Sequence, residues 1–180
     1  MERLTLKNNF LEIVVCPEVG ASIEAFRYNL KGKWVDVMRP TLKYSADKKD
    51  PGGFSCFHLV PYSNRIENGI LRFNGTEYRL KINNSDGHTI HGVGWEHPWT
   101  VLNQTGEEIR VCFDSRKFEQ VNWPFPFTST ITFSIKDNEF IINISIKNEG
   151  WETMPAGLGT HPYFSKKLTE KDDAVIVKLP

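Results

Sequence analysis

Strict period-two alternation in two neighbouring segments is the feature of the sequence that most constrains the fold. In residues 127–135, aromatic and branched apolar residues alternate with threonine and serine, and a similar alternation resumes in residues 140–146. Successive side chains of a β-strand point to opposite faces of a sheet, so each segment predicts one strand with one buried face. The short Asp137-Asn138 turn between them predicts that the two strands form an antiparallel hairpin.

The same pattern recurs along the rest of the chain. Two further hairpins are predicted, 70–73 with 76–80 around Asn74-Gly75 and 99–103 with 108–113 around Thr105-Gly106. Three other segments are strand-like in composition, namely 10–15, 21–28 and 174–179. Residues 43–51 are charged and loop-like, and no segment carries an apolar stripe at helical spacing over three turns. We therefore expect no helix longer than about 11 residues.

These elements predict an all-β fold, a large antiparallel β-sandwich whose loops carry the polar chemistry. The length of 180 residues indicates a single domain over residues 1–180. Lysine and arginine number 22 against 22 aspartate and glutamate, so there is no basic surplus for phosphate contacts and nucleic acid is not expected as a partner. No apolar run approaches the roughly 20 residues of a membrane span. The absence of an apolar signal-peptide core and three cysteines without CxxC spacing predict a cytoplasmic protein.

Two polar, loop-like segments in the first half of the chain are candidates for chemistry. Residues 58–69 contain Arg65, whose planar fork of donors suits neighbouring hydroxyls or a carboxylate. The alternative is a surface pair between Arg65 and Glu67 or another carboxylate. Residues 83–95 contain His88 and His91, but zinc needs three or four ligands and no cysteine pair or HExxH pattern supplies the others. We expect one of these histidines to point into a cleft and the other to pack or bond to the backbone.

A third segment, residues 154–164, holds His161 directly before a proline, which favours extended backbone. Two nearby glycines give the chain freedom to bring this histidine close to a ligand. An imidazole with a pKa of roughly 6.5 can donate or accept a proton at neutral pH. The alternative is a bend between strands with a structural histidine. The aromatic residues 123–127 fit either a platform for a sugar face or a corner of the core.

Taken together, these segments resemble the aldose 1-epimerase (galactose mutarotase-like) family. Four blocks occur in the family's order: PYSNRIENG followed by FNGTEY in 61–78, HTIHG in 88–92, WPFPF in 123–127 and MPAGLGTHPYF in 154–164. The resemblance implies a β-supersandwich enzyme, without metal or cofactor, that interconverts the α and β anomers of a small-molecule sugar. It implies that His161, the acid that protonates the ring oxygen, and His91 are catalytic. Arg65, Asn64, His91 and Trp123 are implied to bind the sugar.

The resemblance also implies that the chain is the N-terminal part of a longer sandwich. The family's general base is a glutamate in C-terminal strands that are expected beyond Pro180. Strands left uncovered in this way would allow self-association.

Three alternatives remain open. The first is a sugar-binding module without catalysis. The second is a hexose-6-phosphate 1-epimerase, which would need basic residues beside the cleft, and the sequence does not place the candidates Arg27, Arg39, Lys43, Arg72 and Lys81. The third is a fragment with no function of its own.

Overall fold

A computed structural model describes residues 1–168, and the strand expected at 174–179 lies outside them. The first sheet contains β1 (Leu4–Lys7), β2 (Leu11–Cys16), β3 (Ser22–Leu30), β4 (Lys33–Asp36), β5 (Cys56–Leu59) and β14 (Gly159–Pro162). Its order is β1-β2-β3-β5-β14, with β4 paired to β3, and every pair is antiparallel. The strands expected at 10–15 and 21–28 are confirmed as β2 and β3. The sheet therefore places β14, from late in the chain, beside β5.

The second sheet contains the two long hairpins predicted by alternation. Its members are β10 (Thr100–Gln104), β11 (Glu108–Asp114), β12 (Phe127–Lys136) and β13 (Glu139–Asn148), paired in that order. Along β12 every second residue from Phe127 to Ile135 is buried, and the residues between them are half-buried. The turns at Thr105-Gly106 and Asp137-Asn138 are confirmed by the antiparallel registers.

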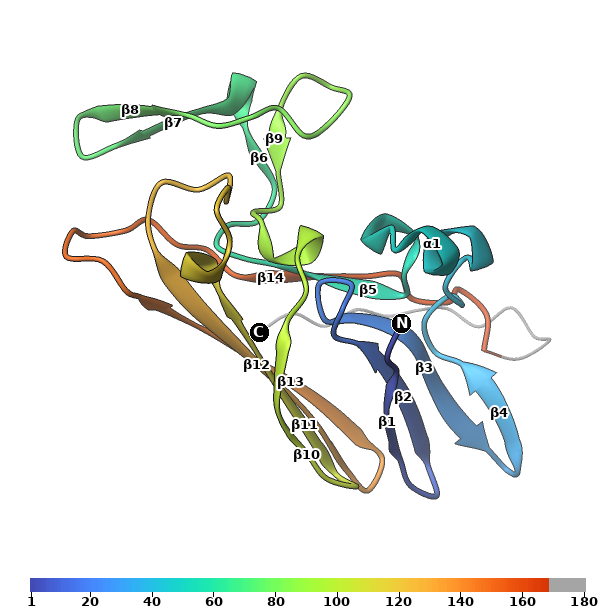
Figure 1. Cartoon of the computed structure of the whole chain (residues 1–180). Helices are drawn as coiled ribbons and strands as arrows, with labels where there is room; N and C mark the ends of the chain where they lie inside the picture. The colour runs from blue at the N-terminus through green and yellow to red at the C-terminus, as the bar shows by residue number, and fades with distance from the viewer. Residues whose placement is uncertain (169–180) are drawn as a thin grey trace.

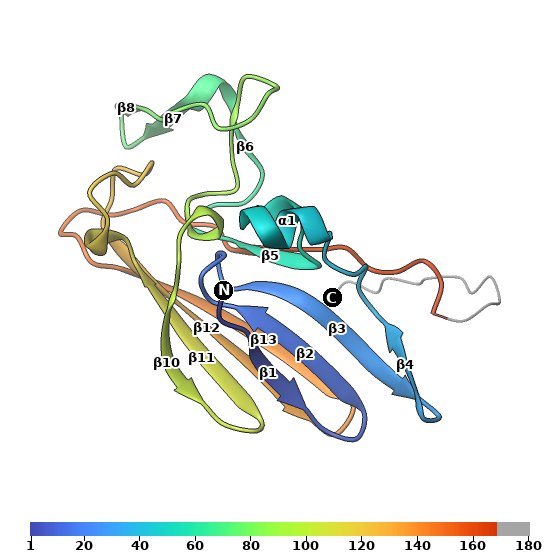
Figure 2. The same cartoon turned by 45° about the vertical axis from the view of Figure 1, so that its right-hand side comes forward.

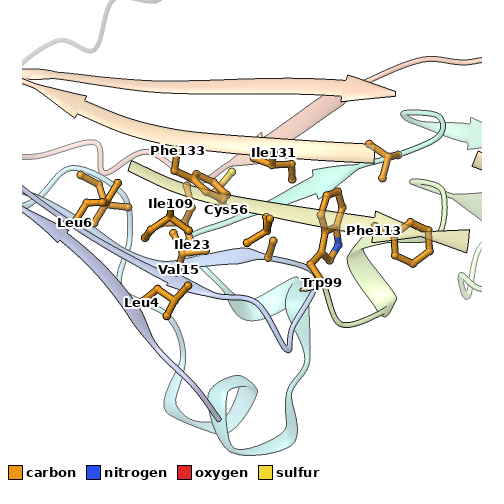
Figure 3. Packing of buried hydrophobic residues seen from close by; sticks show 14 of the residues in the cluster. Leu4, Leu6, Val15, Ile23, Cys56, Trp99, Ile109, Phe113, Ile131 and Phe133 are labelled. Atoms are coloured by element: carbon orange, nitrogen blue, oxygen red, sulfur yellow. The ribbon is translucent and has the colours of Figure 1, made fainter. Parts of the chain in front are cut away.

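The apolar faces of the two sheets pack against each other and form the main core (Figures 2 and 3). Leu6, Val15 and Ile23 come from the first sheet and are 0% exposed. Ile109 and Phe133 come from the second sheet and are equally inaccessible. Burying such side chains is the main stabilising contribution to a fold of this kind. The predicted all-β antiparallel sandwich is confirmed.

A separate arm, residues 64–90, stands above the β5–β14 pair (Figures 1 and 2). It contains β6 (Arg65–Ile66), the turn η2 (Glu67–Gly69), β7 (Ile70–Phe73), β8 (Thr76–Arg79) and β9 (Thr89–Ile90). β6 pairs with β9 and β7 pairs with β8, each as a two-stranded antiparallel sheet. The hairpin predicted at Asn74-Gly75 is confirmed, with both residues in the left-handed region that this turn requires.

The helical elements are short. Besides η2, they are α1 (Lys43–Lys48), η1 (Pro51–Gly53), η3 (Gly94–Glu96) and η4 (Ser115–Lys117). The loop expected over 43–51 is wrong, because a helix of 6 residues forms there. Left-handed backbone at Lys49 ends this helix, and the Asp50 carboxylate accepts a hydrogen bond from the Gly52 amide to begin the next turn. Within residues 1–168, no helix is long and apolar enough to cross a membrane.

Candidate active site

His161 lies on β14 and is positioned by regular strand pairing. It is opposite Phe57 of β5, and the two rings stack with centroids 4.8 Å apart and planes 15° apart. Tyr163, two residues further along, lies 4.8 Å from the same imidazole. Phe57 is 3% exposed, so the platform under His161 belongs to the packed interior. Strand register and ring packing together fix the direction of this histidine.

His91 is positioned in a different way, on left-handed backbone. Its φ is 64°, and the following Gly92 has a φ of 71°. The His91 amide donates to the Asn64 carbonyl at 3.0 Å, and the Val93 amide donates to the Val60 carbonyl at 2.7 Å. A Cβ at Gly92 would lie 2.0 Å from that same Val60 oxygen. Glycine is therefore required directly after His91, which gives the HG pair of the sequence block a steric reason.

The two imidazoles lie side by side. Their centroids are 5.6 Å apart and their planes are nearly perpendicular, at 77°. The Nδ1 atom of each is shielded from solvent and has no hydrogen-bond partner among the described residues. The indole of Trp95 lies 6.1 Å from His91 and stacks on Phe57 at 5.3 Å, so aromatic rings enclose the pair. This arrangement leaves two half-buried imidazoles with capacity for a polar ligand.

The charge state of His91 follows from its surroundings. Burial, followed by the positive charges of His161 and Arg65, holds the pKa of His91 below its usual value. His91 is therefore neutral at pH 7, with one nitrogen able to donate and one able to accept. A positive charge on His161 therefore opposes protonation of His91.

Arg65 lies on β6, opposite Ile90 of β9. Its Nε atom is 2.7 Å from the Asp86 carboxylate, and its Nη1 atom donates to the Asn64 side chain at 3.4 Å. This hydrogen bond is the main reason why the pKa of Asp86 is lowered to about 2. The surface pair that the sequence allowed is present, with Asp86 as the partner, and the guanidinium still acts on His91.

Other expected residues are placed as follows. His88 accepts a hydrogen bond from the Asn68 amide at 3.2 Å, as expected for the histidine of the pair that bonds to the backbone. Trp123 is 7% exposed, and its ring lies 5.2 Å from Tyr62 and 5.9 Å from Phe125. The structure thus places Trp123 at a core corner, and its role in sugar binding stays a prediction.

The structure brings His91 and His161 together and puts Arg65 within electrostatic range of His91. Their convergence on one sugar stays a prediction. Phe57, Trp95 and Asp86 were not singled out from the sequence. Asp86 lies in the polar segment 83–95 that carries both histidines, whereas Phe57 is one apolar residue in a buried strand and gives no separate signal. Within residues 1–168, no group of three or more histidine, cysteine, aspartate or glutamate side chains could hold a metal ion.

Comparison with known proteins gives consistent results. A family model described as aldose 1-epimerase matches residues 2–175. The uncharacterized protein YphB of Escherichia coli is 29% identical over 161 residues, covering 89% of this chain and 51% of YphB. The galactose mutarotase of Sus scrofa is 30% identical over 107 residues, which are 57% of this chain and 30% of that protein. The crystal structure of a putative aldose 1-epimerase from E. coli superposes with a TM-score of 0.74 at 27% identity, covering 91% of this chain and 52% of that one. The chain thus spans about half the length, or less, of the curated relatives it matches.

Proposed function

The chain belongs to the aldose 1-epimerase family, and we propose that this protein interconverts the α and β anomers of a free hexose by acid–base ring opening. The observation that carries the proposal is the pair of half-buried imidazoles, His91 and His161, 5.6 Å apart and close to Arg65. We assign to this set a proton donor in His161, a neutral hydrogen-bonding ring in His91 and a cationic fork in Arg65. These are the groups that a pyranose with several hydroxyls and a ring oxygen can use.

The reaction requires two proton transfers. A base removes the proton from the C1 hydroxyl, the C1–O5 bond breaks as the C1 carbonyl forms, and the ring oxygen takes a proton. We assign that last proton to His161. The open aldehyde then turns about the C1–C2 bond, and the reverse transfers close the ring on the other face of the carbonyl. A positioned proton-transfer group is typically worth ~10²–10⁴-fold in rate.

The surroundings of the two histidines suit different roles. His91 stays neutral because burial and two neighbouring positive charges lower its pKa, so it hydrogen bonds to the sugar without competing for the proton. His161 packs flat on Phe57, which holds its ring in one orientation through repeated proton transfer. Arg65 is assigned to the sugar hydroxyls, with Asp86 fixing one side of its guanidinium. Asn64 is assigned to the same role beside it.

The general base is proposed, as the family resemblance implies, to be a glutamate outside residues 1–180. The described residues are compatible with that assignment. The pKa of His91 is lowered by burial and by the charges of His161 and Arg65. No carboxylate among the described residues contributes to this shift, so none of them is a candidate for the base on this ground.

The substrate is proposed to be an unphosphorylated hexose, because most candidate phosphate ligands are engaged elsewhere. Arg27 pairs with Glu12 and Asp36, Arg72 pairs with Glu77, and Lys81 donates to Gln120. Lys43 is in α1.

Arg39 is the basic residue that supports the phosphate alternative. Its guanidinium carbon lies 3.9 Å from the centroid of the Tyr163 ring, which contacts His161. One of its terminal nitrogens already donates to the carbonyls of Gly52 and Phe54.

The test is the approach of freshly dissolved α-D-glucose and α-D-galactose to anomeric equilibrium, followed by polarimetry with the full-length protein. An epimerase accelerates the approach in proportion to its concentration. A sugar-binding module binds the sugar and leaves the rate at that of buffer, which would contradict the proposal. A matched measurement with glucose 6-phosphate separates the substrates, since faster turnover of the phosphate ester would reassign Arg39 as a phosphate ligand.

A further inference from the structure

One side chain outside the imidazole pair, Asn83, joins both ends of the segment that carries His91. Its amide oxygen accepts from the Ile90 amide at 2.7 Å, and its amide nitrogen donates to the Ile90 carbonyl at 3.2 Å. The same nitrogen donates to the Glu96 carboxylate at 3.0 Å. Asn83 therefore fixes the residue just before His91 and a residue five positions after it.

The segment needs such a support because its strand is short. β9 has only 2 residues and pairs with β6 alone. Ile90 is 9% exposed and Thr89 is 0% exposed, so their backbone groups cannot rely on water. The Asn83 amide meets both backbone groups of Ile90, as a neighbouring strand would.

The backbone of His91 makes the support more important. A residue with a Cβ in the left-handed region costs roughly 1–2 kcal/mol, and such a conformation persists only where the surroundings hold it in place. The Asn64 carbonyl holds His91 itself, and the Val60 carbonyl holds the chain after it. Asn83 completes this set by holding the chain immediately before it.

The bond to Glu96 extends the support to the aromatic wall. Trp95, next to Glu96, lies against both His91 and Phe57. Burial raises the pKa of Glu96, and the hydrogen bond from Asn83 opposes that rise by stabilising the carboxylate. The Asn83 amide thus connects Glu96, the neighbour of Trp95, to Ile90, the neighbour of His91.

We propose that Asn83 is a positioning residue for His91 in the ring-opening reaction. Its side chain sets the direction of the His91 imidazole by holding Ile90 and Glu96 together, without contact to the sugar. The inference deepens the proposed function and rests on it for its catalytic part. Its structural part, that Asn83 determines the environment of His91, stands on the hydrogen bonds alone.

The variant N83A isolates this role. Asn83 and Glu96 border a cavity of about 650 Å³, so water can reach the Ile90 backbone when the amide is removed, and the variant is expected to fold. Water satisfies the exposed groups but does not fix Ile90 relative to Glu96. N103A is the matched control, because Asn103 donates to Glu108 at 3.4 Å on the exposed β10–β11 hairpin.

The measurement is an NMR titration of the His91 imidazole in the full-length protein, together with kcat and KM for anomerisation. N83A is expected to move the pKa of His91 back toward its usual value of about 6.5. It is also expected to lower kcat about tenfold with KM changed less than about twofold. N103A should leave the titration and both kinetic parameters as they are.

The second variant, N83D, guards against a change of fold. It keeps an acceptor for the Ile90 amide but places a second carboxylate beside Glu96. The two carboxylates repel each other at pH 8, so kcat should be lower there than in the wild type. As the pH drops, one carboxyl of the pair takes a proton and kcat should recover. A folded N83A with an unchanged His91 titration and unchanged kcat would overturn the inference, as would equal changes in N103A. If the wild-type protein shows no epimerase activity, the proposed function fails, and the titration still decides whether Asn83 positions His91.

Discussion

His161 and His91 lie next to each other but are held by two different kinds of structure. His161 belongs to β14, whose four residues pair in register with β5, and its ring rests on buried Phe57. His91 lies between the end of a two-residue strand and a left-handed glycine, on backbone whose amides donate individual hydrogen bonds to the Asn64 and Val60 carbonyls. The first support is a regular ladder with an aromatic platform. The second is a set of specific polar contacts around a strained turn.

The difference shows where each half of the pair is vulnerable. Ladder hydrogen bonds and ring packing are distributed over many atoms, so no single polar group decides the place of His161. At His91, each contact is made by one atom, and the loss of one leaves a buried group unpaired or a strained residue unsupported. A single substitution around His91 should therefore have a large effect on the position of that side chain. Substitutions around His161 should act mainly by lowering the stability of the whole fold.

The largest effect is expected for G92A. A Cβ at Gly92 would meet the Val60 carbonyl oxygen at 2.0 Å on backbone with a φ of 71°, so the turn must move. We expect a loss of roughly 4 kcal/mol in the free energy of unfolding, measured by urea denaturation. The control is G75A, since Gly75 has a φ of 77° and no atom within 4 Å. That variant should lose about 1 kcal/mol from backbone strain alone, and equal losses in the two variants would show that the Val60 contact is unimportant.

The ladder beneath His161 is expected to weaken in acid through His58. This residue lies on β5 opposite Thr160, is 0% exposed and sits 5.3 Å from the Phe133 ring. Burial lowers the pKa of His58 to about 4. Between about pH 6.5 and 4 the unfolded chain therefore binds a proton that the folded chain does not, so stability falls as pH falls, by about 3 kcal/mol over that window.

The check is urea denaturation at pH 7 and at pH 4.5 for the wild type and H58L. The leucine variant should lose less stability between the two pH values, because it removes the group that titrates. An identical pH dependence in both proteins would mean that His58 does not control the acid sensitivity of the ladder.

A smaller effect is expected for D86N. The pair between Arg65 and Asp86 is exposed, with side chains 50% and 34% accessible, and exposed pairs are worth at most about 1 kcal/mol. The variant should raise KM for the sugar about threefold with little change in kcat, because it loosens a binding group and leaves the histidines in place. E77Q is the matched control, since Glu77 pairs with Arg72 and Arg79 elsewhere on the arm. A KM that rises equally in both variants would remove Asp86 from the site.

Alternation predicted the sandwich well, because residues such as Ile131 and Phe133 alternate with polar neighbours, and this local pattern shows which face of the strand is buried. It failed at residues 43–51, where α1 ends at left-handed Lys49 and the Asp50 cap begins the next turn, because neither feature shows in an alternation pattern. Strand signals also revealed nothing about β14 lying beside β5, since that pairing joins distant parts of the chain.

The sequence blocks identified His91, His161 and Arg65 as candidates but not what holds them. Phe57 becomes the platform for His161 only through the β5–β14 register, which no local pattern encodes. Asn83 is one of two asparagines in the segment 83–95, and its role appears only from its hydrogen bonds to Ile90 and Glu96 in the folded chain. Residue type and spacing therefore cannot identify side chains, such as Phe57 and Asn83, that position the histidines through tertiary contacts.

The most direct test of the proposed function is the anomerisation rate of the full-length protein carrying H161N. Asparagine keeps a hydrogen-bonding side chain but has no proton to transfer at neutral pH. We expect kcat to fall by ~10²–10⁴-fold with KM changed much less, whereas R65A should raise KM as well, since its donors act in the ground state and the transition state. An H161N protein that equilibrates glucose or galactose at the wild-type rate would contradict the role of His161 and with it the proposed mechanism.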